Sequence, residues 1–350
     1  MRVLIVAEQL RRAVPGGIGT YVRGLLQGLA APGLAGSVEV TLLASGPVPG
    51  SDLPVRTSVL PAPVLTRLWD RGVLRAPDGY DVVHAPSLLT VPSTAPVSVT
   101  VHDVAWRDVP EAFPARGRRW HEAALTRAMQ RASTVIVPSH ETAAALAAVA
   151  CRDGRVHVVE EGCDHLPPPD RQGAAELLGR LGVRPPYLLT VSTIEPRKNL
   201  ARLVAAYRAA RAALPEPWPL VVVGPSGWGP ALAPAAGVVL AGFVDEAVKA
   251  ALLADARLLV YVPLVEGFGL PAVEAMAMGT PVVASPMPST GGAALTIDPT
   301  DVEAMADALV RAATDDVVRA RLLSAGGRRA AALTWEAAAR GHVDLWRAGA

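Results

Sequence analysis

The sequence predicts an α/β protein made of two parallel-sheet domains followed by C-terminal helices. Short β-branched runs alternate with helical patterns along most of the chain, which is typical of parallel sheets with helices on both faces. The chain has 350 residues, 51% of them hydrophobic, which suffices for two cores of ordinary size. A proline cluster between Leu166 and Pro186 separates the two halves.

The first half carries a series of short strand patterns. Its strand candidates are Val3–Ala7, Val38–Leu43, Asp81–His84, Val97–Val101 and Thr134–Val137. A helix is expected soon after the first strand, because apolar residues recur there at helical spacing, at Ile18, Val22, Leu25, Leu26 and Leu29. We therefore expect residues 1–168 to form an N-terminal domain.

A second series of strand patterns begins near Tyr187. Its candidates are Tyr187–Val191, Leu220–Val223, Val238–Leu240, Arg257–Tyr261 and Pro281–Ala284. These strands predict a second domain of the same kind over residues 185–333.

The C-terminal part of the chain reads as helices. Thr300 and Glu303 have the spacing of a capping box, and Asp315–Ala332 predicts a further helix. Thr334 is expected to cap the last helix, whose two tryptophans indicate that it docks on another surface. We expect this helix, residues 334–350, to pack back on the N-terminal domain.

Composition excludes several classes of protein. The formal net charge is +1 and the pI about 7.9, so no global basic field would attract nucleic acid. Only Cys151 and Cys163 are present and no CxxC occurs, which argues against a disulfide framework or a zinc site. The most apolar stretch is interrupted by Asp255 and Arg257, so no membrane span is expected. We expect a cytoplasmic protein.

The strongest motif is Val262–Ser285, VPLVEGFGLPAVEAMAMGTPVVAS. A strand leads into a glycine-flanked loop, Pro271 suits the first turn of a helix, and Gly279 suits its end. Such a loop leaves backbone N–H groups free, and the helix dipole favours an anion there. The segment therefore predicts an anion-binding loop.

Two acids in this motif, Glu266 and Glu274, are separated by seven residues. We expect Glu266 on the loop and Glu274 in the first helical turn, so that both face one crevice. Carboxylates suit sugar hydroxyls, because each can accept two hydrogen bonds from a diol. Taken alone, Glu274 is compatible with an ordinary first-turn acid and Glu266 with a solvated loop residue, but the whole segment favours a binding site.

A second motif, TVSTIEPRKNL, covers Thr190–Leu200. Arg197 and Lys198 follow a buried strand and precede a helix, with Asn199 as its expected N-cap. Two cations at the carboxyl end of a strand and the start of a helix suit a diphosphate. A solvated basic pair on a turn is the alternative.

Two weaker signals lie in the first half. PGGIG at Pro15–Gly19 lets the backbone approach a ligand closely, although it lacks the GxGxxG pattern of a dinucleotide site. His102 and Asp103 follow a strand, at the edge that lines the crevice in open α/β sheets. A flexible turn and a structural histidine are the respective alternatives.

Together, EPRKNL, EGFGLPAVEAMAMGTPVVAS and the early GGIG resemble the retaining glycosyltransferases of family 4. The resemblance covers nearly the whole chain and is strongest over Tyr187–Ser285. It implies the GT-B fold, in which two Rossmann-like domains face each other across a cleft.

The resemblance also implies roles for individual residues. Arg197 and Lys198 would hold the donor diphosphate, Glu274 the nucleotide ribose, and Glu266 would approach the donor sugar. The other residues implied at the donor are Gly16 and Gly17 in the early glycine loop, His102 against the transferred sugar, Ser192, Val244 near the base, and Gly267, Phe268, Gly269 and Leu270 after Glu266. Ser192 replaces the glycine of many relatives, and Pro286–Gly292 lacks the acidic residue expected after its proline.

The resemblance further implies retention of anomeric configuration and no metal or other cofactor, and no DxD stands at a strand end in the sequence. HDVAW, at His102–Trp106, resembles mannosyltransferases of this family, and the resemblance favours GDP-mannose as donor, with UDP-glucose or another UDP-hexose as the alternative. The acceptor would be a glycan, a lipid-linked or a small-molecule hydroxyl, as in polysaccharide biosynthesis.

Three other classes of protein fit these motifs less well. EPRKNL and the two spaced acids argue against a nucleotide-sugar epimerase, and the missing GxGxxG argues against a nicotinamide oxidoreductase. A non-catalytic sugar-nucleotide binding protein is disfavoured because the cations and both acids are all present.

One helix pattern suggests weak peripheral contact with the inner face of a membrane. Its arginines lie near Phe113 and Trp120, and they are Arg116, Arg118, Arg119, Arg127 and Arg131. A solvated arginine face is the alternative, and the one we favour.

Overall fold

The computed structural model describes residues 1–149, 154–216 and 218–349, and Cys151 lies outside them. The chain divides into two compact units, which are described separately. The first comprises Met1–Arg107, Pro114–His165 and Thr334–Ala350, and the second comprises Asp108–Phe113 and Leu166–Leu333.

The first unit is built on a seven-stranded sheet in which all neighbours are parallel, in the order β3-β2-β1-β4-β5-β6-β7. Its strands are β1 (Arg2–Val6), β2 (Glu39–Ala44), β3 (Val55–Thr57), β4 (Val82–Ala85), β5 (Val97–Thr100), β6 (Thr134–Val137) and β7 (Val156–Val158). Its helices are α1 (Gly16–Leu29), α2 (Ala62–Asp70), α3 (Ala105–Asp108, ending in the second unit), α4 (Ala115–Arg131), α5 (His140–Val149) and α12 (Trp335–Gly349).

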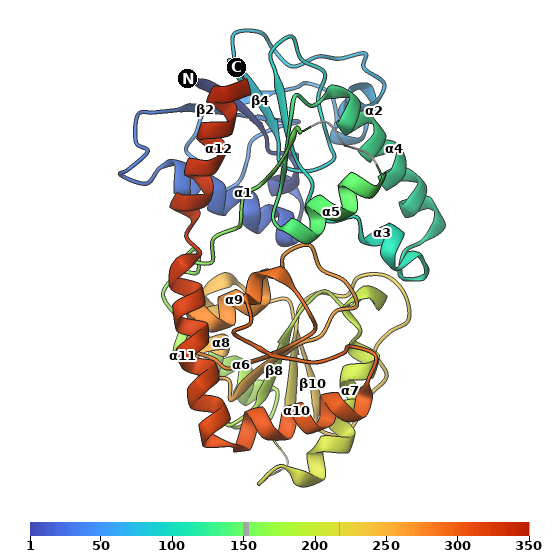
Figure 1. The fold of residues 1–350 in the computed structure, drawn as a ribbon, viewed down its shortest axis with the longest axis vertical. Helices are drawn as coiled ribbons and strands as arrows, with labels where there is room; N and C mark the ends of the chain where they lie inside the picture. The colour runs from blue at the N-terminus through green and yellow to red at the C-terminus, as the bar shows by residue number, and fades with distance from the viewer. Residues whose placement is uncertain (150–153, 217, 350) are drawn as a thin grey trace. The chain divides into compact units, whose positions relative to one another are not determined.

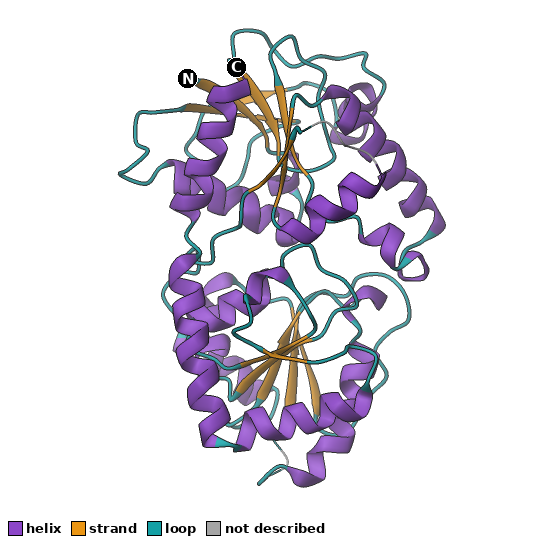
Figure 2. Ribbon diagram, viewed as in Figure 1, coloured by secondary structure: helices purple, strands orange, loops and turns teal. Residues whose placement is uncertain are grey.

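The second unit has a six-stranded parallel sheet in the order β10-β9-β8-β11-β12-β13. Its strands are β8 (Leu188–Val191), β9 (Leu220–Val223), β10 (Val238–Gly242), β11 (Leu258–Tyr261), β12 (Val282–Ala284) and β13 (Leu295–Thr296). Its helices are α6 (Arg171–Arg180), α7 (Leu200–Ala210), α8 (Glu246–Asp255), α9 (Leu270–Ala277), α10 (Val302–Thr314) and α11 (Asp316–Ala332). Figure 2 shows helices flanking each sheet.

Both sheets have the strand order of a Rossmann-like fold, in which the direction of chain progress reverses in the middle of the sheet. In the first unit the reversal lies between β1 and β4, and in the second it lies between β8 and β11. The central strands are buried and mostly apolar because helices cover both of their faces. The predicted α/β class with parallel sheets is therefore confirmed.

The last helix, α12, packs against α1 in the first unit (Figure 1). The two helices approach closely because α1 has glycines at the contact. A Cβ atom at Gly24 would lie 2.0 Å from the Trp335 ring, and one at Gly28 would lie 2.0 Å from the Trp335 carbonyl oxygen. Trp335 and Trp346 are both fully buried, so this helix is part of the first unit's core.

Helix caps differ from the sequence predictions in two places. Asn199 lies at the N-terminus of α7 with a left-handed φ of 60°, but its side chain makes no capping hydrogen bond. Thr300 donates its hydroxyl to Asp298, and Asp301 caps α10 by accepting from Ala304 N. Thr334 does accept from Ala337 N in the first turn of α12, as predicted.

Candidate active site

The site residues of the second unit gather where the sheet reverses direction. β8 and β11 are neighbours, and their carboxyl ends lead into the loops that carry the two strongest sequence motifs. Arg197 and Lys198 lie on a short 3₁₀ turn, Pro196–Lys198, after β8, whereas Glu266 follows β11. Open α/β sheets bind ligands at this position, because two adjacent loops diverge there and leave a crevice between them.

The carboxylate of Glu266 joins the two cations. Its Oε1 atom accepts from Arg197 Nη1 at 3.0 Å and is also in direct contact with Lys198 Nζ. The Tyr261 hydroxyl donates to the same oxygen at 2.9 Å and accepts from Lys198 Nζ at 2.9 Å. The structure therefore brings Arg197, Lys198 and Glu266 together, and it adds Tyr261, which sequence analysis did not single out.

Burial shapes the electrostatics of this cluster. Burial alone would raise the pKa of Glu266, but the charges of Arg197 and Lys198 outweigh it and hold that pKa at about 2. Burial lowers the pKa of Lys198, and the nearby Arg197 charge acts in the same direction, against the attraction of Glu266. Burial and the negative charge of Glu266 raise the pKa of Tyr261 well above its usual value. At neutral pH, Glu266 is therefore ionised and Tyr261 is a neutral hydrogen-bond donor.

The loop after β8 is tied to the loop after β11 by backbone groups. Leu264 N donates to Arg197 O at 2.9 Å, and Arg197 Nη1 also donates to Val265 O at 3.2 Å. The buried Asn199 amide donates to Val262 O at 3.1 Å and to Pro299 O at 2.7 Å. Asn199 thus holds two loops together. The side-chain oxygen that would cap α7 accepts instead from Arg202 Nη1 at 2.9 Å.

Glu195 is a second acid beside the cations that sequence analysis did not single out. Its carboxylate lies 3.1 Å from Arg197 Nη2, and the residue is 7% exposed. Burial raises the pKa of Glu195, with the Arg197 and Lys198 charges acting against it. Arg197 is consequently held between two carboxylates, and its guanidinium has a fixed orientation.

The glycine loop after Glu266 leads into α9 as predicted. Gly267, Phe268, Gly269 and Leu270 are buried, and Pro271 lies in the first helical turn. Gly269 has a φ of 100°, and a Cβ atom there would lie 2.5 Å from Met287 Sδ, so the position requires glycine. Ser289 holds this loop by donating its hydroxyl to Gly269 O at 3.0 Å.

Glu274 lies in the second turn of α9, so the expected first-turn position is wrong. The residue is 2% exposed, and its Oε1 atom accepts from Lys249 Nζ on α8 at 3.1 Å. Lys249 is itself buried, and sequence analysis did not single it out. Burial has the largest single effect on the pKa of Lys249 and lowers it. The charges of Glu274 and Glu246 together outweigh burial, so the net shift of the pKa is upward.

Two further predicted residues of this unit lie at the carboxyl edge of the sheet. Ser192 follows β8 directly, and its buried hydroxyl has no hydrogen-bond partner within the described residues. Gly224 approaches it so closely that a Cβ atom there would lie 2.0 Å from Ser192 O. Val244 is half-buried in the turn between β10 and α8, next to the exposed ring of Phe243.

Gly16 and Gly17 belong to the first unit, where they begin α1 rather than form a separate loop. Gly16 has a φ of 63°, and both glycines are exposed. A Cβ atom at either position would meet nothing within 4 Å. The positive φ explains the glycine at position 16, while the open space at Gly17 leaves room for a ligand to approach.

His102 follows β5 in the first unit, also at the carboxyl edge of its sheet. Its Nδ1 lies 3.1 Å from Glu161 Oε1 and its Nε2 lies 3.0 Å from Pro86 O. Burial lowers the pKa of His102, but the hydrogen bond and charge of Glu161 outweigh burial, and the net shift is upward. His102 Nε2 could contact a sugar only if it gave up its hydrogen bond to Pro86 O.

A buried polar chain behind His102 was not predicted from the sequence. The Tyr21 ring packs edge-on against His102, with centroids 4.7 Å apart. Its hydroxyl lies 2.7 Å from Thr100 Oγ1 and 2.6 Å from His342 Nε2. This chain connects the strand that precedes His102 to α12.

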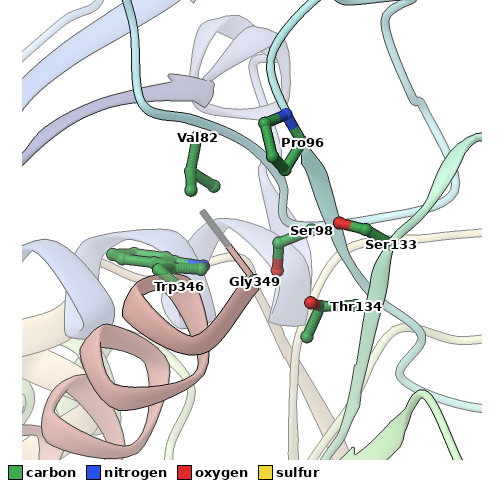
Figure 3. A pocket seen from close by; sticks show the side chains of 7 residues that line it. All are labelled: Val82, Pro96, Ser98, Ser133, Thr134, Trp346 and Gly349. Carbon is green, nitrogen blue, oxygen red and sulfur yellow. The ribbon is translucent and has the colours of Figure 1, made fainter.

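A small pocket in the first unit lies away from the ligand edge of the sheet (Figure 3). It is lined by Val82, Pro96, Ser98, Ser133, Thr134, Trp346 and Gly349. The lining residues of the sheet come from the amino ends of β4, β5 and β6, whereas ligands of this fold bind at the carboxyl ends. We therefore do not assign the pocket to the active site.

Two of the five arginines expected on one face of α4 point into the protein instead. Arg127 Nη2 donates to Asp70 Oδ1 at 2.9 Å, and Arg131 donates to Thr90 O and Asp70 O, each at 3.1 Å. Near the start of the helix, Trp120 is 43% exposed, and Arg116 and Arg119 are exposed beside it. Across the described residues, every helix is too short or too polar to span a bilayer.

Two family models match the chain. Residues 15–165 match the model described as Glycosyltransferase Family 4, and residues 185–315 match the model described as Glycosyl transferases group 1. Apart from residues 108–113, the first match lies in the first compact unit, and the second match lies in the second unit.

Relatives of similar length include two mannosyltransferases. The O-antigen chain mannosyltransferase B of Escherichia coli is 27% identical over 270 residues, which is 73% of this chain and 71% of that protein. The MMP alpha-(1->4)-mannosyltransferase of Mycolicibacterium hassiacum is 30% identical over 323 residues, which is 83% of this chain and 76% of that protein.

Solved structures share the fold over almost the whole chain. Sucrose-phosphate synthase from Thermosynechococcus elongatus matches with a TM-score of 0.74 and 22% identity, over 99% of this chain and 98% of that chain. HepE of Anabaena, in complex with UDP and glucose, matches with a TM-score of 0.72 and 20% identity, over 99% and 100% of the two chains.

The two Rossmann-like units and these matches define a glycosyltransferase with the GT-B fold. The chain belongs to glycosyltransferase family 4, as both family models and the Mycolicibacterium relative show.

Proposed function

We propose that this glycosyltransferase moves a hexose from a nucleotide-diphosphate sugar to an acceptor hydroxyl, with retention of configuration and without a metal. The observation that carries the proposal is the cluster of Arg197, Lys198 and Glu266 where the second sheet reverses direction. Two fixed cations at this position suit the diphosphate of such a donor.

The cations would act mainly on the leaving group. Negative charge grows on the diphosphate as the bond from its oxygen to the sugar C1 breaks. Groups that already point at this charge stabilise the transition state more than the ground state. Arg197 and Lys198 are held in place by Glu195, Glu266 and Tyr261, so little reorganisation is needed during the reaction.

The ionisation of Glu266 argues against its acting as a general base. A carboxylate whose pKa is about 2 is a weak proton acceptor at neutral pH. We therefore propose a front-face displacement, in which the acceptor oxygen bonds to C1 on the side that the diphosphate leaves. The acceptor proton passes to the departing phosphate oxygen, and Glu266 serves to orient the cations and the sugar.

Glu274 would accept hydrogen bonds from the ribose of the nucleotide. It lies on α9, the helix that begins directly after the glycine loop next to Glu266. Gly267, Phe268, Gly269 and Leu270 would contact the sugar and phosphate, and Ser192 and Val244 would line the nucleotide side. The first unit would contribute Gly16, Gly17 and His102 to donor binding.

GDP-mannose is our first choice of donor. HDVAW at His102–Trp106 favours it, and relatives with the name mannosyltransferase support it. A UDP-hexose is the second candidate, supported by the HepE structure with UDP and glucose. A glycan acceptor in polysaccharide biosynthesis is supported by the O-antigen relative.

A thermal-shift panel of GDP, UDP, ADP and their sugars tests the proposal. Ligand binding raises apparent stability by mass action, so the most stabilising nucleotide identifies the base of the donor. Addition of EDTA should leave both the thermal shift and the transfer of sugar from the donor unchanged. A panel in which no nucleoside diphosphate raises the melting temperature would contradict the proposed function.

A further inference from the structure

We infer that Lys249 is a positioning residue that holds the Glu274 carboxylate ionised and oriented for the nucleotide ribose. The inference rests on the proposed function and extends it to a residue outside the sequence motifs. It begins from an unusual arrangement, a lysine that is 8% exposed on one helix and an acid that is 2% exposed on the next.

The two side chains meet between α8 and α9, which pack against each other. Lys249 Nζ donates to Glu274 Oε1 at 3.1 Å. The same ammonium lies 2.7 Å from Glu246 Oε2, one turn earlier on α8, where the Glu246 side chain is 41% exposed. Lys249 therefore links a buried acid to a more exposed one.

A buried carboxylate remains ionised only with a compensating charge, because transfer of a lone charge out of water is very costly. Only the ionised form offers acceptors at both oxygens, which a ribose diol requires of Glu274. Lys249 supplies that charge from the side of α8, and its contact with Oε1 also restricts rotation of the carboxylate.

The position of Glu274 connects this pair to the donor site. Glu274 is four residues after Leu270, so both lie on one face of α9, and Leu270 is the first residue after the glycine loop. A purely structural ion pair between two helices would not need to stand at the carboxyl edge of the sheet. Replacement of such a pair by apolar residues is often neutral for stability, so stability alone does not explain it.

The test compares the affinity for a nucleoside diphosphate with and without its ribose hydroxyls. GDP and 2′,3′-dideoxy-GDP, or the UDP pair if UDP binds more tightly, are titrated calorimetrically into the full-length protein. The wild type should prefer the ribose form by about tenfold or more, the scale of one hydrogen bond to a charged acceptor. In Lys249→Gln this preference should fall to within about twofold, as in Glu274→Gln, because the dideoxy form does not use the carboxylate.

Two further variants separate positioning from folding. Glu246→Gln removes the other partner of Lys249 and should keep the ribose preference. Lys249→Arg keeps a cation and should retain most of the preference even if Lys249→Gln does not fold. A folded Lys249→Gln protein with the wild-type preference, or a Lys249→Arg protein that has lost it, would overturn the inference. A wild type that binds neither GDP nor UDP would instead contradict the proposed function on which it rests.

Discussion

Arg197 and Glu266 are 69 residues apart in the sequence, yet Arg197 Nη1 and Glu266 Oε1 lie 3.0 Å apart. The contact exists because β8 and β11, which are distant in the chain, are neighbours at the reversal of the sheet. Glu266 is thereby the counter-ion of both Arg197 and Lys198, and it holds the two cations next to each other. The catalytic value of each partner can be measured separately.

Lys198→Ala should reduce kcat by roughly 10²- to 10³-fold, the scale for loss of one preorganised donor to a developing charge. The measurement is turnover at saturating donor. Arg208→Ala removes an exposed cation from α7 and serves as the control that should keep its kcat. Unchanged turnover in the Lys198 variant would exclude a role for its charge on the leaving group.

Tyr261→Phe should lower kcat/KM by about tenfold, because Glu266 loses a donor and Lys198 loses an acceptor at once. Steady-state kinetics with the donor that binds best measures this effect. Tyr207→Phe is the matched control, since its hydroxyl is equally buried in the same unit but donates to Trp218 O at 2.7 Å, in the core. Equal kinetic losses in both variants would mean that Tyr261 acts only through stability.

The sequence predicted the central strands and the edge strand β10, and it missed the other three edge strands. β3, β7 and β13 are two or three residues long and lie at the ends of their sheets, where their side chains are only partly buried. An edge strand needs no continuous apolar run, so hydrophobic pattern gives little signal there. The interior strands are covered on both faces and are therefore mostly apolar, which gives a clear hydrophobic signal.

The residues of the candidate site also differ in how strongly the sequence indicates them. Arg197, Lys198 and Glu266 stand in motifs with local signals, whereas Lys249 stands at an ordinary position of a helix, 25 residues before its partner Glu274. Thr300 was expected to cap α10, but Asp301 is one residue closer to the helix and accepts from Ala304 N. The assignment of donor contacts to individual residues stays a prediction until a ligand complex is measured.

The protein should lose stability as the pH falls from about 6.5 to about 4, in part through His342. Burial, with a smaller effect of the His102 charge, lowers the pKa of His342 to about 4, so the unfolded chain binds the proton first. The free energy of unfolding therefore falls with decreasing pH over this window, by roughly 3 kcal/mol for this group, and the contribution is constant below it. His84, whose pKa burial also lowers, acts in the same direction. The raised pKa of His102 changes stability only above about pH 6.5, where the free energy of unfolding rises as the pH falls, and it is constant within this window.

Urea unfolding at several pH values measures this dependence. His342→Gln should flatten the curve between about pH 4 and about pH 6.5, whereas His140→Gln, at an exposed position, should not. Parallel curves for the wild type and His342→Gln would show that the imidazole does not titrate differently in the folded and unfolded states.

Weak binding to anionic membranes, if the start of α4 provides it, should depend on a small set of side chains. Arg116 and Arg119 are exposed there beside Trp120, and together they would give an electrostatic contact that salt weakens. Flotation with anionic vesicles at low salt would then recover a minor fraction of the protein and neutral vesicles none, whereas the solvated arginine face that we favour predicts no recovery with either. Arg116→Ala with Arg119→Ala should abolish recovery without loss of stability. Arg127→Ala should instead destabilise the fold, because Arg127 is bonded to Asp70, and flotation that depends on Arg127 but not on Arg116 and Arg119 would refute this surface.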